Sequence, residues 1–166
     1  MTHYIKFGIE ALIRLKKKYP EMKAHLIGVP DQPSDLPYWI LYTKKATPAQ
    51  FRSIYNDSMI YMCPSTEEAF GLTGAEAMDG GTVYVLSDYG GVHKYTENGR
   101  NVLLSSLGNV AGLVEHVTYL FEHREERIRI EKNGYQIFIC LLGEKRWICL
   151  KKRYNHENED GLLRKC

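Results

Sequence analysis

Short apolar segments alternate with amphipathic ones along most of this chain, and this alternation constrains the fold more than any other feature. The predicted strands are the apolar segments 24–28, 39–42, 59–63, 83–86 and 102–104. Strands that are apolar throughout are typical of parallel sheets, whose two faces are both covered by helices. Parallel neighbours also need a long crossover, which is usually helical and right-handed. The sequence therefore predicts an α/β fold with a parallel sheet and flanking helices.

The segments between these strands have helical patterns. Thr47, Pro48 and Gln50 form a helix start, with Thr47 as the N-cap of a capping box and Pro48 at the first helical position. Further helices are predicted from apolar spacing that begins at Ile5, from the small residues of 70–79, and from one apolar face over 110–121. The segment 151–166 is charged and loses this periodicity. We therefore expect a folded domain over 1–150 and a charged C-terminal tail over 151–166.

Composition excludes several classes of protein. The chain has 166 residues, 44% of them hydrophobic, which suits one globular domain with a real core. A net charge of +2 gives no strongly basic field, so a nucleic-acid partner is not expected. The apolar run 137–142 is far shorter than a bilayer span of about 20 residues. The first residues do not resemble a signal peptide, and the scattered cysteines suit a reducing compartment, so we expect a cytoplasmic protein.

The strongest candidate for chemistry is the segment 63–78, which leaves a predicted strand and enters a predicted helix. In open α/β sheets, ligands bind where strands end and helices begin. Gly71 and Gly74 would let backbone N–H groups approach an anion, and the helix dipole favours a phosphate there. Glu76 is placed to accept hydrogen bonds from ribose hydroxyls. Purely structural interpretations stand beside this one, because Ser65 and Glu68 have capping-box spacing and Glu76 also suits a solvated helix face.

The stretch from Pro64 to Leu104 resembles the donor-binding half of retaining GT-B glycosyltransferases, the family 4-like group also called glycosyl transferases group 1. The family pattern is Pro-Ser-x-x-Glu-Gly-Phe-Gly-Leu-x-x-x-Glu-Ala-Met, with seven residues between its two glutamates. Glu68 and Glu76 keep this separation, and the segments 70–72 and 76–78 match outright. Segments 87–92 and 97–101 look like the family's Ser-Asp-x-Gly-Gly and Asp-Gly-x-Asn elements. The likeness covers roughly 5–135.

This resemblance implies a Rossmann-like domain, the C-terminal half of a GT-B fold. It would bind a UDP- or GDP-sugar and take part in moving the sugar, with retention, to an acceptor glycan or a lipid-linked sugar, as in polysaccharide biosynthesis. Glu68 would be the catalytic residue and contact the donor sugar, and Glu76 would bind the ribose. The resemblance places the donor-binding residues at Phe70, Gly71, Leu72, Thr73, Glu76 and Gly91.

The same resemblance implies that no metal or other cofactor is needed. The helix dipole and basic side chains would offset the charge that develops on the leaving group. Since many acceptors in this group are lipid-linked, the parent enzyme is expected at the inner membrane surface as a peripheral protein. Metal ligation is not indicated by the residues either, because the histidines form no complete set, and His93, His116 and His123 are expected at the surface.

Several positions depart from the family pattern. Ala69 replaces a glycine and Lys94 replaces a glutamate. Family members begin this domain with a strand and a loop carrying basic residues. From the resemblance we expect this chain to lack the first strand, one basic ligand and the N-terminal acceptor-binding domain. We therefore expect this chain alone to be inactive. Two alternatives remain, a nucleotide-sugar epimerase of GT-B fold and a non-catalytic α/β interaction domain.

Overall fold

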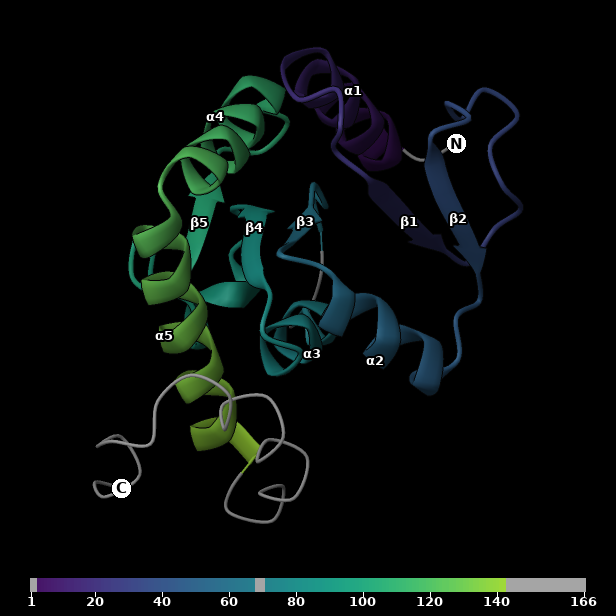
Figure 1. Ribbon diagram of the computed structural model, residues 1–166. Helices are drawn as coiled ribbons and strands as arrows, with labels where there is room; N and C mark the ends of the chain where they lie inside the picture. The colour runs from purple at the N-terminus through teal and green to yellow at the C-terminus, as the bar shows by residue number, and fades with distance from the viewer. Residues whose placement is uncertain (1–2, 68–70, 143–166) are drawn as a thin grey trace.

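The computed structural model describes residues 3–67 and 71–142 and shows helices arranged around two groups of strands (Figure 1). In chain order the described elements are α1 (His3–Lys18), β1 (Ala24–Gly28), β2 (Ile40–Lys44), α2 (Pro48–Asp57), β3 (Ile60–Cys63), α3 (Leu72–Asp79), β4 (Val83–Ser87), the 3-10 helix η1 (Gly91–Lys94), β5 (Val102–Ser105), α4 (Val110–Glu122) and α5 (Arg124–Leu142). The strands lie at or within two residues of the predicted segments. The predicted tail, 151–166, lies outside the described residues.

All of the strand pairing among the described residues is parallel, as predicted. β1 pairs with β2 in a two-stranded sheet, with Leu26 opposite Tyr42. The order β3-β4-β5 makes a separate three-stranded sheet, in which β4 is central. α1 joins the two sheets, because Ile9 belongs to an apolar cluster with β2, whereas Leu15 packs in the cluster that contains β4. The predicted parallel sheet is thus divided in two and bridged by a helix.

The core is built on both faces of β4, whose residues are all buried. Successive side chains of a strand point to opposite faces. Val83 and Val85 accordingly pack with α1 and α4, and Tyr84 and Leu86 pack with α3 and α5. This two-sided burial explains why the segment is apolar throughout and why it predicts a strand so clearly.

Local rules account for α2 but not for α5. The capping box at Thr47 is present as predicted: its hydroxyl accepts from the Gln50 N–H, and the Gln50 side chain accepts from the Thr47 N–H. The sequence does not predict α5, because charged residues interrupt the apolar periodicity of this segment and because it contains Gly134. That glycine sits against α3, where an added Cβ would lie 3.0 Å from the Met78 sulfur and 3.2 Å from the Asn101 carbonyl oxygen. Within the described ranges, no helix has the length and apolar character to cross a membrane.

Candidate functional site

The connection from β3 to α3 holds most of the residues that the sequence singles out. Gly71 is the N-cap of α3, with φ 73° and ψ 46°, the left-handed conformation that glycine adopts at little cost. Among the described residues, no side chain caps this helix end. The first N–H groups of a helix lack intrahelical acceptors, and the helix dipole adds a partial positive charge to them. The start of α3 can therefore donate hydrogen bonds to an anion.

Two tyrosine hydroxyls enclose Gly71. The Tyr95 hydroxyl donates to the Gly71 carbonyl oxygen at 3.0 Å in a buried contact. A Cβ added at Gly71 would collide with the hydroxyls of both Tyr89 and Tyr95. The Tyr89 hydroxyl also lies 2.9 Å from that of Tyr84 on β4. The turn before α3 is thus held from the side of β4 and of the loop that follows it.

The first turn of α3 packs on the same aromatic group. The Tyr84 ring fills the space that a side chain at Gly74 would need, so the helix lies directly against β4. The Tyr61 hydroxyl donates to the Thr73 hydroxyl at 3.2 Å, and the Tyr61 and Tyr84 rings are 5.4 Å apart. Burial raises the pKa of Tyr84 far above its usual value, so its hydroxyl stays protonated. We call Tyr61, Tyr84, Tyr89 and Tyr95 the tyrosine cluster.

The glycine pair after β4 forms the second predicted loop. Gly90 has φ 71° and Gly91 opens η1. Asp88 accepts from the Gly90 N–H at 3.5 Å, and its carboxylate lies 2.7 Å from Nε2 of exposed His93. Tyr89 and Tyr95 flank this loop on either side, and both reach Gly71. The tyrosine cluster therefore connects the Gly71 turn to the loop that contains Gly91.

The remaining predicted site residues divide into three groups. Leu72 and Glu76, four positions apart, are exposed on one face of α3, and Thr73 is half-buried. Glu68 and Phe70 lie outside the described residues. Ser65 is buried, and its hydroxyl donates to the Glu67 carbonyl at 3.3 Å, whereas Gly71 is the N-cap of α3. The capping-box interpretation pairs Ser65 with Glu68, and Glu68 lies outside the described residues.

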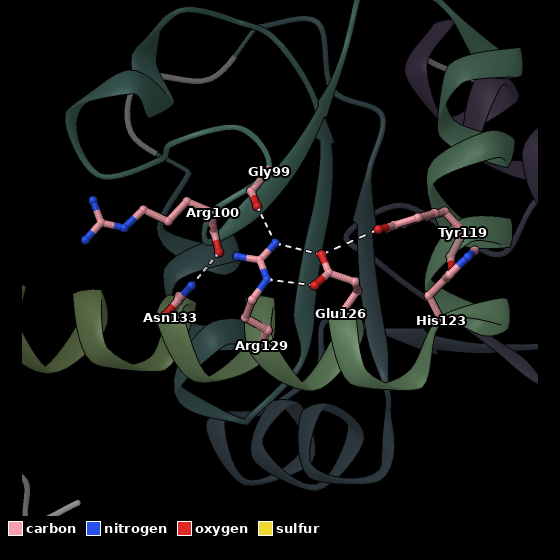
Figure 2. Close-up of polar contacts among 7 residues, drawn as sticks. All are labelled: Gly99, Arg100, Tyr119, His123, Glu126, Arg129 and Asn133. Carbon is pink, nitrogen blue, oxygen red and sulfur yellow. Dashed lines mark hydrogen bonds and ion pairs between the residues drawn. The ribbon is translucent and has the colours of Figure 1, made fainter.

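The segment 97–101 is hydrogen-bonded to Tyr95, at the end of the loop that contains Gly91. Buried Asn101 donates to the Tyr95 carbonyl at 2.9 Å and accepts from the Glu97 N–H at 2.6 Å. Figure 2 shows how α5 holds this segment: Arg129 donates to the Gly99 carbonyl at 2.8 Å, and Asn133 donates to the Arg100 carbonyl at 2.9 Å. Hydrogen bonding to Arg129 lowers the pKa of Glu126, which keeps this carboxylate charged beside the guanidinium.

The histidines take up separate positions. His116 is half-buried, and its Nε2 lies 2.9 Å from the Leu104 carbonyl, so the expectation of a surface residue is only partly met. His93 and His123 are exposed, as expected. Among the side chains that the structure describes, no group of three or more His, Cys, Asp or Glu residues could hold a metal ion.

The fold defines a class of protein. Parallel strands flanked by helices match the Rossmann-like domains of GT-B glycosyltransferases. Residues 2–137 match the family described as Glycosyl transferases group 1, and the chain belongs to that family. The GtfA subunit of a UDP-N-acetylglucosamine–peptide N-acetylglucosaminyltransferase from Streptococcus pneumoniae serotype 4 is 26% identical over 170 residues. That match takes in 98% of this chain but only 31% of the relative.

Solved structures share this fold. The C-terminal domain of a glycosyl transferase group 1 family protein, LpcC, from Francisella tularensis has a TM-score of 0.72 at 24% identity, over 83% of this chain and 78% of that one. HepE from Anabaena, solved in complex with UDP-glucose, has a TM-score of 0.71 at 20% identity, over 84% of this chain and 42% of that one. At this level of identity the likeness shows the fold.

Proposed function

We propose that this chain is the donor-binding domain of a retaining glycosyltransferase of the family 4-like group and that it binds a UDP- or GDP-sugar. The observation that carries the proposal is the left-handed Gly71 turn, which opens α3 without a cap from any side chain that the structure describes. Such a helix start suits the diphosphate of a nucleotide sugar. The solved complex of the structural neighbour HepE with UDP-glucose supports this choice of ligand.

Each predicted residue has a role in this proposal. The backbone N–H groups at Phe70, Gly71, Leu72 and Thr73 would bind the diphosphate, with Gly91 in the second loop. Glu76 would accept hydrogen bonds from the ribose, and its exposed position on α3 leaves it accessible. Glu68 would contact the donor sugar as the catalytic residue. The helix dipole supplies about half a positive charge to the leaving diphosphate, which removes the need for a metal ion.

The parent protein would carry the rest of the reaction. We propose an acceptor-binding domain facing this one, because the matched relative is much longer than this chain. The acceptor would be a glycan or a lipid-linked sugar of polysaccharide biosynthesis, used in the cytoplasm at the inner membrane surface. On this proposal the present chain binds the donor but transfers no sugar by itself.

A nucleotide panel in a thermal-shift assay tests donor binding. With UDP or GDP at 100 times the Kd, the chain should gain about 2.7 kcal/mol, which is several degrees for a domain of this size. The variant Glu76→Gln should lose part of this shift, whereas Glu115→Gln on α4 should keep it. The absence of any shift with millimolar nucleotide would count against the proposal and favour a non-catalytic interaction domain. Epimerisation of a nucleotide sugar by this chain, measured by NMR, would favour the epimerase.

A further inference from the structure

A continuous series of hydrogen bonds leads from α5 to the start of α3. Asn133 and Arg129 hold the backbone at 99–100, and Asn101 in the same segment donates to the Tyr95 carbonyl at 2.9 Å. The Tyr95 hydroxyl then donates to the Gly71 carbonyl at 3.0 Å. Tyr95 and Asn101 are both buried, so the two bonds that Tyr95 makes are shielded from competing water, whereas those from Arg129 and Asn133 are exposed.

The Gly71 carbonyl receives more than the helix alone would supply. The N–H groups of Gly74 and Ala75 donate to it at 3.0 and 3.2 Å, and the Tyr95 hydroxyl is the third donor. This oxygen belongs to the same peptide unit as the Leu72 N–H. Hydrogen bonds to the oxygen of an amide polarise the whole unit and strengthen its N–H as a donor, by about 10–30% per bond.

We infer that Tyr95 is a positioning residue of the donor site: its hydroxyl fixes the Gly71–Leu72 peptide and strengthens the Leu72 N–H as a donor to the nucleotide diphosphate. This inference rests on the proposed function and adds a residue to it. Tyr95 acts through the backbone, by its hydrogen bond to the Gly71 carbonyl. A bulky hydrophobic residue would fill the same buried space, and the hydroxyl is what this role requires.

The test compares Tyr95→Phe with Tyr19→Phe. Each variant removes one hydrogen-bonded hydroxyl, but that of Tyr19 donates to Glu122 at 2.9 Å at the surface between α1 and α4. Titration calorimetry with UDP should show a Kd raised about threefold to tenfold in Tyr95→Phe, the range that one hydrogen bond supplies, and an unchanged Kd in Tyr19→Phe. Hydrogen exchange without nucleotide should be faster over 71–75 in Tyr95→Phe alone.

The outcomes distinguish failure of the proposed function from failure of the role of Tyr95 alone. If the unsubstituted chain binds neither UDP nor GDP, the proposed function fails, and the donor role of Tyr95 fails with it. If the unsubstituted chain binds UDP and Tyr95→Phe binds it equally well, the inference alone is overturned. Unchanged exchange over 71–75 would also overturn it, because the hydroxyl would then not fix this turn.

Discussion

Gly71 shows how much of the site depends on one residue. Its φ of 73° favours glycine, and the hydroxyls of Tyr89 and Tyr95 occupy the space of any side chain. Gly99 has a similar φ of 77°, but no atom lies within 4 Å of the place where its Cβ would be. A side chain at Gly99 would meet backbone strain alone, whereas one at Gly71 would meet both backbone strain and the tyrosine cluster.

Replacing Gly71 with alanine should destabilise the protein more than replacing Gly99. A left-handed alanine costs about 1–2 kcal/mol, and forcing atoms into a packed site adds about 1–3 kcal/mol. Gly71→Ala should therefore lower the free energy of unfolding by roughly 2–5 kcal/mol, against about 1–2 kcal/mol for Gly99→Ala. Urea unfolding followed by circular dichroism measures both. Equal losses would show that the tyrosine hydroxyls move aside freely.

The sequence indicates the glycines of the site but not the residues that hold them. Gly71 and Gly91 stand in motifs with local spacing, and such spacing is visible in one sequence. Tyr95 contacts Gly71 across 24 positions, a pairing that the fold creates and no local pattern contains. In the sequence Asn101 stands out only as part of a family-like segment, whereas the structure shows that its side chain donates to the Tyr95 carbonyl.

Among the elements, the contact between α1 and α4 carries the clearest electrostatic consequence. At the end of α1, Lys18 donates to the Glu122 carboxylate at 2.8 Å, and the Tyr19 hydroxyl donates to it at 2.9 Å. The bond from Lys18, and then that from Tyr19, lowers the pKa of Glu122 below its ordinary 4.5. The bond to Glu122 raises the pKa of Lys18 above its ordinary 10.5.

The sign of the pH dependence follows from these two directions. Because the pKa of Glu122 is lowered, its ion pair stabilises the fold above pH 4.5, and this stabilisation is lost as the pH falls through the folded-state pKa. Because the pKa of Lys18 is raised, its contribution to stability is present below pH 10.5 and is lost as the pH rises through the raised pKa. The Glu122→Gln variant should therefore be less stable than the unsubstituted chain between these limits, with a difference that shrinks on acidification. Chemical unfolding at a series of pH values measures it, with Glu115→Gln as control. Because the groups are exposed, the effect should be small and should diminish with salt. A constant difference down to the most acidic values would contradict the pairing.

Local chemistry decides which elements were predictable. α2 begins with a complete capping box, and β4 is apolar on both faces, so both follow from short windows of sequence. α5 has a glycine in its interior, which ordinarily weakens a helix by about 1 kcal/mol. The glycine is explained by tertiary packing, because Gly134 lets α5 lie close to Met78 of α3. The strands also divide into two sheets, and the sequence does not predict this, because apolar periodicity does not specify which strands pair.

At the scale of the whole molecule, α1 is the element that joins the two sheets (Figure 1). One of its faces places Ile9 in the apolar cluster shared with β2, and another places Leu15 in the cluster shared with β4 and α4. Since the two sheets form no common ladder among the described residues, we expect the burial of α1 to couple them. The site at the start of α3 depends on β4, so it depends indirectly on this helix.

Leu15→Ala tests that role against Ile13→Ala on the same helix. The Leu15 side chain is 1% exposed and that of Ile13 is 38% exposed. Truncating a buried leucine removes apolar contacts and leaves a cavity, so Leu15→Ala should cost about 2–5 kcal/mol of unfolding free energy. Ile13→Ala should cost less, about 1–2 kcal/mol, because Ile13 keeps more than a third of its surface in water and its truncation leaves no enclosed cavity. Guanidinium unfolding measures both variants, and the thermal shift with UDP reports whether the site survives. If Leu15→Ala were no more harmful than Ile13→Ala, α1 would not couple the sheets, and the two-stranded sheet would be stable independently of the three-stranded one.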